Sequence, residues 1–426
     1  MPEVHPGIEA PGFRRDAALP YLTAAVEPLP RQTDPGFARA FARFGDARVV
    51  LLGAMGDGAL EFDQARAAVT RWLIENRGFN LLAFEADAEE VQALDEEVRG
   101  IRNRRHLNPL AADHPATAWR SAEVDALFGW LSDHNGRRPE VDQVRLCGLD
   151  VYGRSAAMRL ALAFLDRVSP QSGAIARARM WGPRPWAPID TLPAVSGDYA
   201  RCEGAVTAML VDALGRRLSN HSPSGMSANS PPLRPTHEAE AYYRCQFYGG
   251  DEAWSQRSKQ LADELARQLG IRDSRTRAVV WAHNAHVGDA RATEMGTVRG
   301  QRSLGQLTRE RFGEAARLIG MGAYAGSMAD CDAPDGAFRS RPLRLAAAGS
   351  YEDLCHQTGA DRFLLDLRPG VHSSLRKALS PLRAERFIGP RESTETDPLS
   401  DYAECRLPEQ FDAWVWFDEV SAAAPR

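Results

Sequence analysis

The chain has 426 residues, of which 44% are hydrophobic and 26% are charged. This composition is ordinary for a folded protein and excludes a collagen-like, coiled-coil or wholly disordered chain. Fifty-two basic residues against 57 acidic ones give a net charge of −5, which argues against a broad nucleic-acid-binding surface. We therefore expect a small-molecule substrate and no nucleic-acid partner, while the oligomeric state stays open.

The cysteines and the apolar runs indicate the compartment. The six cysteines include no Cys-x-x-Cys pair, and this spacing fits neither a disulfide scaffold nor a zinc knuckle. The first residues, MPEVHPGIEAPGF, lack a basic region followed by an apolar one. No apolar run approaches the roughly 18 residues of a membrane span. We expect a cytoplasmic protein that carries no export signal and does not interact with membranes.

Short apolar runs alternate with helical patterns along most of the chain. The runs are rich in β-branched or aromatic residues, which is typical of buried strands. They cover residues 48–52, 81–84, 143–149, 278–282, 317–321, 362–365 and 413–417. Residues 61–77 place apolar side chains along one helical stripe, and Gly78 supplies a stop. The alternation predicts an α/β fold, with a largely parallel sheet flanked by helices.

Residues 152–273 differ from the rest of the chain. They carry helical patterns, few strand signals and a Pro/Ser/Gly-rich passage near 220–235. We interpret this stretch as a mostly helical insertion with a flexible loop, placed between two parts of the α/β core, 1–151 and 274–426. The loop is either a lid over a site or a plain surface loop.

Polar residues follow the predicted strands at the point where each strand ends. In open parallel sheets, ligands bind outside the carboxyl ends of the strands. The residues in these positions are Asp57, Glu85, Asp150, His283, Asn284 and His286, with Asp366 and Arg368 after a later strand. We expect carboxylates and imidazoles from these positions to meet on one rim.

The glycine-rich turn Gly53–Gly58 does not fit a nucleotide site. Its spacing is GxxGxG, no Lys-Ser/Thr pair follows, and Asp57 and Glu61 place negative charge where a phosphate would meet the helix. We expect no nucleotide cofactor. Arg66, beside the apolar stripe of the helix, is predicted to lean toward Glu85 or Asp57, either as a structural ion pair or as part of a site.

His283 and His286 lie three residues apart directly after a strand. No HExxH pattern or third ligand accompanies them, so we expect no metal. An imidazole that acts as acid or base is the better functional interpretation, and a helix cap or a bond to a core carbonyl is the structural one. Because no GxSxG motif occurs, a hydrolase of this sequence would use water activated by a carboxylate or an imidazole.

Distant segments, taken in order, resemble the erythromycin esterase-like proteins. The matching segments are residues 46–53, 61–79, 84–87, 147–152, 281–286, 304–305, 319–320, 349–352 and 410–413, so that the resemblance covers nearly the whole chain. It implies a cofactor-free, metal-independent carboxylic-ester hydrolase. The best-known members open the lactone ring of macrolide antibiotics, which connects the family to antibiotic resistance.

The resemblance has two departures at the first strand end. The family motif Gly-Glu-Ala-Thr-His-Gly contains the proposed general base, His, and a supporting Glu. Here the same positions hold Asp57 and Ala54. A solvated aspartate is a weaker base than histidine by roughly 2.6 pKa units unless burial raises its pKa. A further family motif, Arg-Asp, reads Arg257-Ser258.

The strand ends and the resemblance together predict a role for each of eight residues. The catalytic positions are Glu85, His283, Asp57, Arg66 and His286, and the substrate-binding positions are Arg257, Asn284 and Asp150.

Three functions remain open. The first is hydrolysis of an ester or lactone of a small, macrolide-like natural product, with Asp57, Glu85 or His283 as the base. The second is another acid/base reaction, such as dehydration, elimination or cyclisation, in natural-product biosynthesis. The third is binding of a small molecule without catalysis.

Overall fold

A computed structural model describes residues 16–101, 121–152, 154–180, 197–220, 237–248, 250–272, 275–330, 339–389 and 401–424. Apart from Asn220, the last residue of a helix, the predicted flexible loop near 220–235 lies outside the described residues. None of the described helices is both long enough and apolar enough to cross a membrane.

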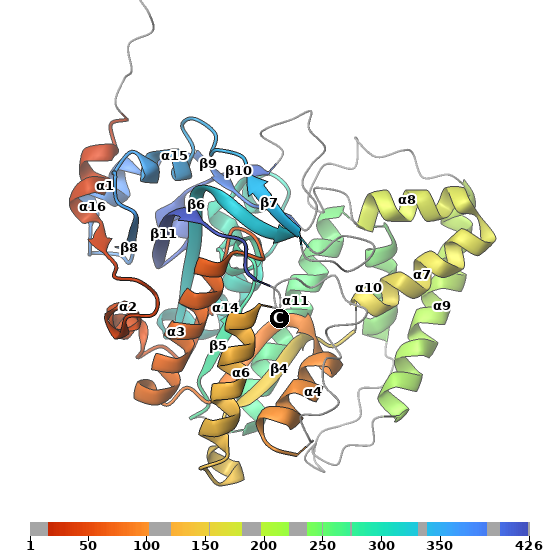
Figure 1. Ribbon diagram of the computed structural model, residues 1–426. Helices are drawn as coiled ribbons and strands as arrows, with labels where there is room; N and C mark the ends of the chain where they lie inside the picture. Colours follow the sequence, from red (N-terminus) through yellow and green to blue (C-terminus); the bar gives the residue numbers. More distant parts are fainter. Residues whose placement is uncertain are drawn as a thin grey trace, which may run out of the picture.

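A nine-stranded sheet forms the centre of the molecule (Figure 1). Its order is β1-β8-β11-β6-β2-β5-β3-β4, and β7 pairs with β6. The strands β11, β6, β2, β5, β3 and β4 are parallel to one another, whereas β8 pairs antiparallel with β11 and β1, and β7 pairs antiparallel with β6. The predicted α/β class with a largely parallel sheet is therefore confirmed. The strands are β1 (Glu27–Pro28), β2 (Val49–Leu52), β3 (Leu81–Asp87), β4 (Arg145–Asp150), β5 (Ala278–Trp281), β6 (Ala316–Asp330), β7 (Arg339–Leu343), β8 (Arg362–Asp366) and β11 (Ala413–Val420), with β9 (Arg383–Arg386) and β10 (Tyr402–Cys405) in a separate hairpin.

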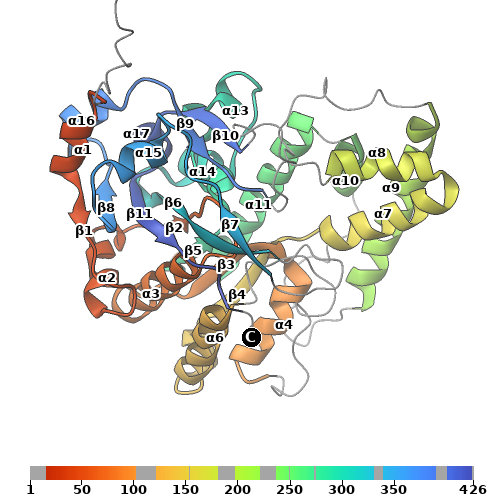
Figure 2. The same ribbon diagram turned by 45° about the horizontal axis from the view of Figure 1, so that its top comes forward.

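Helices cover both faces of the sheet (Figure 2). Side chains alternate between the faces of a strand, so that Val50 and Leu52 belong to one apolar core and Val49 and Leu51 to the other. Burial on both faces explains why β2 is a continuous apolar run. The helices are α1 (Leu19–Ala25), α2 (Pro35–Arg39), α3 (Leu60–Arg77), α4 (Ala88–Val98), α6 (Ala122–Asn135), α7 (Arg154–Val168), α8 (Pro170–Met180), α9 (Gly197–Asn220), α10 (His237–Tyr248), α11 (Gly250–Arg272), α12 (Asn284–Val287), α13 (Glu294–Thr297), α14 (Leu304–Phe312), α15 (Tyr351–His356), α16 (Ser373–Ala378) and α17 (Leu407–Gln410).

Helix α3 forms where the sequence predicts it. Its stripe of Phe62, Ala65, Val69 and Leu73 is buried against the sheet. Gly78 ends the helix with φ +68°, a conformation that glycine adopts without strain. Because Arg66 follows Ala65 on the buried side of this helix, its long side chain runs inward.

Helices α7 to α11 occupy the stretch predicted as an insertion, and its described part contains no strand. Figure 1 shows α7 to α10 beside the sheet, with α11 between them and the strands. Residues of α7 to α10 share a small apolar core. The division of the chain into 1–151, 152–273 and 274–426 as separate units stays a prediction.

The direction of β8 corrects one expectation. Because β8 runs antiparallel to β11, Asp366 at its end lies opposite Ala413, the first residue of β11. Asp366 and Arg368 therefore lie at the edge opposite the carboxyl ends of the parallel strands. There they bind each other, with Nη2 to Oδ2 at 2.7 Å. The expectation that they join the rim is wrong, since an apolar run does not reveal strand direction.

Candidate functional site

The turn after β2 is held by the neighbouring strand and by Asn284. The N–H groups of Gly53 and Met55 donate to the carbonyls of Ile319 and Met321, at 2.7 and 3.0 Å. Asn284 donates its Nδ2 to the Met321 carbonyl at 3.0 Å. A Cβ on Gly53 would lie 2.2 Å from Asn284 Oδ1, so only glycine permits this approach. Asn284 is fully buried, and its predicted contact with a substrate stays a prediction.

Asp57 extends from this turn next to Arg66. The Asp57 side chain is 42% exposed, whereas that of Arg66 is 2% exposed, and Arg66 Nη1 lies 3.9 Å from Asp57 Oδ1. Arg66 Nη2 donates to the Ala282 carbonyl at 2.6 Å, and its guanidinium lies 5.8 Å from the centre of the Trp281 ring. A carbonyl and an aromatic face therefore fix the cation beside the carboxylate.

The surroundings of Asp57 change its basicity. Although part of the side chain is exposed, neighbouring protein removes enough hydration to raise the pKa of the Asp57 carboxyl. The positive charge of Arg66 opposes this rise, while Glu85 adds to it. Asp57 is therefore a stronger base than a solvated aspartate.

Glu85 is the hub of a second group of contacts. Its Oε1 accepts a hydrogen bond from Arg257 Nη1 at 2.8 Å and lies 3.1 Å from His286 Nε2. Its Oε2 accepts the backbone N–H of His283 at 3.1 Å. Arg257 Nε lies 3.9 Å from Asp150 Oδ2. Strand β3, helix α11, the segment after β5 and the end of β4 thus meet around the Glu85–Arg257 pair.

The charges of this group are set by burial and pairing. Burial alone would raise the pKa of Glu85, but His286, Arg257 and the His283 N–H together hold it well below its ordinary value. Burial lowers the pKa of His286 to about 4, and its ring stacks on Trp254 at 4.1 Å. Because His286 is neutral at neutral pH, Arg257 is the cation that keeps Glu85 ionised.

Both ring nitrogens of His283 have partners. Nδ1 accepts the Ala285 N–H at 3.1 Å and caps α12. Nε2 lies 2.9 Å from the Met55 carbonyl and 3.2 Å from the Ile388 carbonyl. Since carbonyls only accept, we assign the ring proton to Nε2. This arrangement matches the helix-cap interpretation, and an acid/base role for His283 stays a prediction.

The structure thus brings the predicted residues into two adjacent groups, one around Asp57 and Arg66 and one around Glu85. The coordinates add two residues that the sequence analysis missed. Asp63, one turn before Arg66, is 2% exposed, and burial raises the pKa of its carboxyl to about 7. Its position in the first turn of α3 makes it look like an ordinary helix N-terminal acid. Trp254 lies one helical turn before Arg257, and this spacing was the available signal.

Across the described residues, no group of three His, Cys, Asp or Glu side chains is arranged to hold a metal ion.

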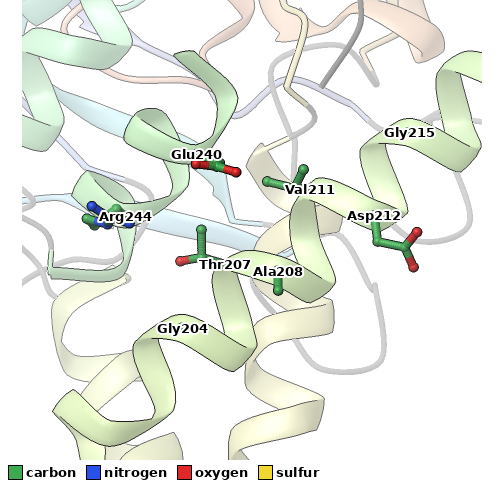
Figure 3. Close-up of a pocket in the computed structure, with 8 residues that line it drawn as sticks. All are labelled: Gly204, Thr207, Ala208, Val211, Asp212, Gly215, Glu240 and Arg244. Atoms are coloured by element: carbon green, nitrogen blue, oxygen red, sulfur yellow. The ribbon is translucent and has the colours of Figure 1, made fainter. Parts of the chain in front are cut away.

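A hollow of about 520 Å³ lies between α9 and α10 (Figure 3). None of the predicted site residues lines this hollow. The residues that line it are Gly204, Thr207, Ala208, Val211, Asp212, Gly215, Glu240 and Arg244.

The fold and the site define an α/β protein whose parallel strands carry carboxylates and imidazoles to their carboxyl ends, where arginines from helices α3 and α11 meet them. Comparison places it more narrowly, since the model of the erythromycin esterase family matches residues 74–420. The chain belongs to this family. The matched region begins after Asp57 and Arg66, so that their family positions rest on the motif resemblance alone.

Solved structures share the fold. A Bacillus cereus protein has a TM-score of 0.65 at 17% identity, with 96% of this chain and 98% of that chain covered. A succinoglycan biosynthesis protein has a TM-score of 0.64 at 17% identity, with 98% and 100% covered. A mutant of the erythromycin esterase EreC in its open conformation has a TM-score of 0.59 at 16% identity, with 94% and 98% covered.

Proposed function

We propose that the protein is a metal-independent hydrolase of an ester or lactone of a small natural product, with Asp57 as the base that activates water. The observation that carries the proposal is the placement of Asp57. It is the most exposed of the predicted catalytic side chains, it stands beside the buried cation of Arg66, and its surroundings raise its pKa. A base must be reachable and must hold a proton well enough to remove it from water.

The proposed step conserves atoms and charge. The Asp57 carboxylate takes a proton from water while the water oxygen bonds to the ester carbonyl carbon, whose π electrons move to the carbonyl oxygen. The oxyanion electron pair then re-forms the carbonyl, the bond from that carbon to the alcohol oxygen breaks with its electron pair on the alcohol oxygen, and this oxygen takes the proton from Asp57. The products are an acid and an alcohol, or a hydroxy acid when the substrate is a lactone.

The remaining predicted residues then act by position. The Glu85–Arg257 ion pair holds β3, α11 and the His283 backbone in one arrangement. The His283 ring links the turn at Met55 to Ile388 through Nε2. Asn284 holds the same turn through its bond to the Met321 carbonyl. We assign these residues to keeping Asp57 in place.

The test combines labelled water with matched variants. The wild type is incubated with a panel of macrolactones in ¹⁸O-water and the products are analysed by mass spectrometry. Hydrolysis places one labelled oxygen in the product, and Asp57→Asn lowers kcat by about 10²- to 10⁴-fold. Asp263→Asn is the matched control, because Asp263 is 47% exposed on α11 and should leave turnover unchanged.

The other outcomes contradict the proposal in distinct ways. A product lighter by one water indicates a dehydratase or lyase, and a product of unchanged mass indicates a cyclase. Saturable thermal stabilisation without turnover indicates a binding protein.

Asp57→His, alone or with Ala54→Glu, restores the family residue types. It should increase hydrolysis, because histidine is the stronger base.

A further inference from the structure

Three fully buried polar side chains lie close to the segment that ends in Ile388. Glu352 lies in the first turn of α15, Glu385 lies in β9 and Gln410 ends α17, and each has 0% of its surface exposed. Two of the three come from sequence segments, 349–352 and 410–413, that the hydrolytic step leaves unused. Residues almost 60 positions apart therefore meet around Glu385.

These side chains have few hydrogen-bond partners. Glu352 Oε1 accepts the Arg386 N–H at 2.9 Å. Within the described parts of the chain, Glu352 Oε2, both oxygens of Glu385 and both amide atoms of Gln410 lack a partner at hydrogen-bond distance. The Cys405 thiol and the Gln410 amide lie beside Glu385 without reaching that distance. An ionised carboxylate in such a setting is costly, and a protonated one much less so.

Proton binding follows from this environment. Burial raises the pKa of Glu352, against the effect of the nearby Arg386 charge. Burial and the neighbouring Glu352 raise the pKa of Glu385 well above its ordinary value. The other titratable groups that face the pair are Tyr402 and Cys405 of β10 and Tyr351 and Cys355 of α15, and the pKa of each is itself raised by burial. The pair therefore retains protons that a solvated pair would lose.

The three buried side chains lie next to both partners of His283, the segment that ends in Ile388 and the helix α12 that His283 caps. Two residues after Arg386, Ile388 donates its N–H to the Met55 carbonyl at 2.6 Å and offers its carbonyl to His283 Nε2 at 3.2 Å. On the other side, Gln410 packs against Gly288, where an added Cβ would lie 2.6 Å from Gln410 Nε2. Gly288 is the residue that ends α12, whose first turn His283 caps.

We propose that Glu352, Glu385 and Gln410 are positioning residues, in which a proton-holding carboxyl pair sets the Ile388 carbonyl and α12 against His283 and so orients the turn that carries Asp57. That Asp57 is the group being oriented rests on the proposed function. That the three buried side chains position Ile388 and His283 does not depend on the proposed function. Ionisation of the pair would place two like charges in a fully buried site with few hydrogen-bond donors, and would loosen this segment.

The sign of the pH dependence follows from the raised pKa values. A folded state that holds protons the unfolded chain has lost becomes less stable as pH rises. The loss starts near the unfolded glutamate pKa of about 4.3 and continues up to the folded value. Glu385→Gln mimics the protonated form and removes this loss.

The first test is thermal denaturation of wild type and Glu385→Gln between pH 4 and pH 9. The variant should gain Tm relative to wild type as pH rises, by about 2 °C or more at pH 9, and the gain should vanish near pH 4, below the unfolded glutamate pKa. Glu314→Gln is the matched control because Glu314 is 97% exposed, and its difference from wild type should not change with pH. A pH-independent difference for Glu385→Gln, or a loss that grows with pH, overturns the proposal.

The second test reads His283 directly and needs no turnover. In ¹⁵N-histidine-labelled protein at pH 7, the His283 ring should show a protonated Nε2 and an unprotonated Nδ1. Glu352→Ala should remove this preference for one protonated ring nitrogen. Glu352→Gln, which keeps the acceptor for the Arg386 N–H, should retain it to higher pH than wild type. Persistence of the wild-type pattern in Glu352→Ala, or its loss in Glu352→Gln, contradicts the positioning role even if hydrolysis by Asp57 is established.

Discussion

Removing the guanidinium of Arg257 should destabilise the protein by an amount typical of a broken buried ion pair. The Arg257 and Glu85 side chains are 9% and 14% exposed, with Nη1 and Oε1 at 2.8 Å. With charge centres about 4 Å apart and an effective dielectric constant of about 20, their attraction is about 4 kcal/mol. Arg257→Met leaves Glu85 charged, buried and without this partner. We expect the free energy of unfolding to fall by about 3–5 kcal/mol.

The assay is urea denaturation at pH 7, followed by circular dichroism, on Arg257→Met, Glu85→Gln and the double variant. The double variant should recover part of the loss, so that the coupling energy exceeds about 1 kcal/mol. Lys259→Met, on the same helix, is the control, because Lys259 and its partner Asp263 are 59% and 47% exposed and an exposed pair contributes only about 0–1 kcal/mol. Strict additivity of the two single variants, or an Arg257→Met cost no larger than that of the control, would refute the reasoning.

Three further outcomes are expected. Gly53→Ala should cost about 1–3 kcal/mol in urea denaturation because its Cβ would collide with Asn284 Oδ1 at 2.2 Å; unchanged stability would contradict the close approach. Thr70→Val removes the acceptor of the buried Trp281 Nε1–H, now at 3.0 Å, and should cost about 1–3 kcal/mol, whereas a neutral effect in thermal denaturation would show that the bond contributes nothing. Because burial lowers the His286 pKa to about 4, wild-type stability should fall as pH drops from about 6.5 toward 4, and His286→Gln should flatten this slope; parallel curves would disprove it.

Local patterns were sufficient for the elements that lie inside the sheet. The run at 48–52 is apolar on both faces because helices cover both faces, and it forms β2 at Val49–Leu52. The stripe at 61–77 forms α3, which buries one face against the sheet. Both signals come from burial, which acts at regular intervals along the element and therefore leaves a pattern in a short window of sequence.

Elements that depend on distant partners were not predictable in this way. The expected strand 317–321 extends as β6 to Asp330. Its small residues Gly320 and Gly322 carry no strand signal, yet an added Cβ on either would press on the Trp414 ring. Their small size makes room for an aromatic side chain from another strand. The hairpin of β9 and β10 was likewise absent from the sequence prediction.

The candidate site shows the same division. The sequence places Glu85 at a strand end and expects a cation beside it, with Arg66 as the candidate. In the structure Arg66 contacts Asp57 at 3.9 Å, and Arg257 pairs with Glu85 from 172 positions away. A pattern of strand ends predicts which side chains reach the rim. It does not predict which of two cations meets which carboxylate, because that depends on how α11 packs across the sheet.

The route of the chain around α11 limits how this protein can be shortened. Helices α7 to α11 lie between β4, at the edge of the sheet, and β5, in its interior. A short peptide in place of residues 154–272 would leave every strand of the sheet in the sequence, and yet would delete Arg257 and Trp254. Such a shortened protein would retain Glu85 without the cation that pairs with it. A natural or engineered deletion of residues 154–272 would therefore also need a substitution at Glu85. We expect the helical segment and Glu85 to be gained and lost together.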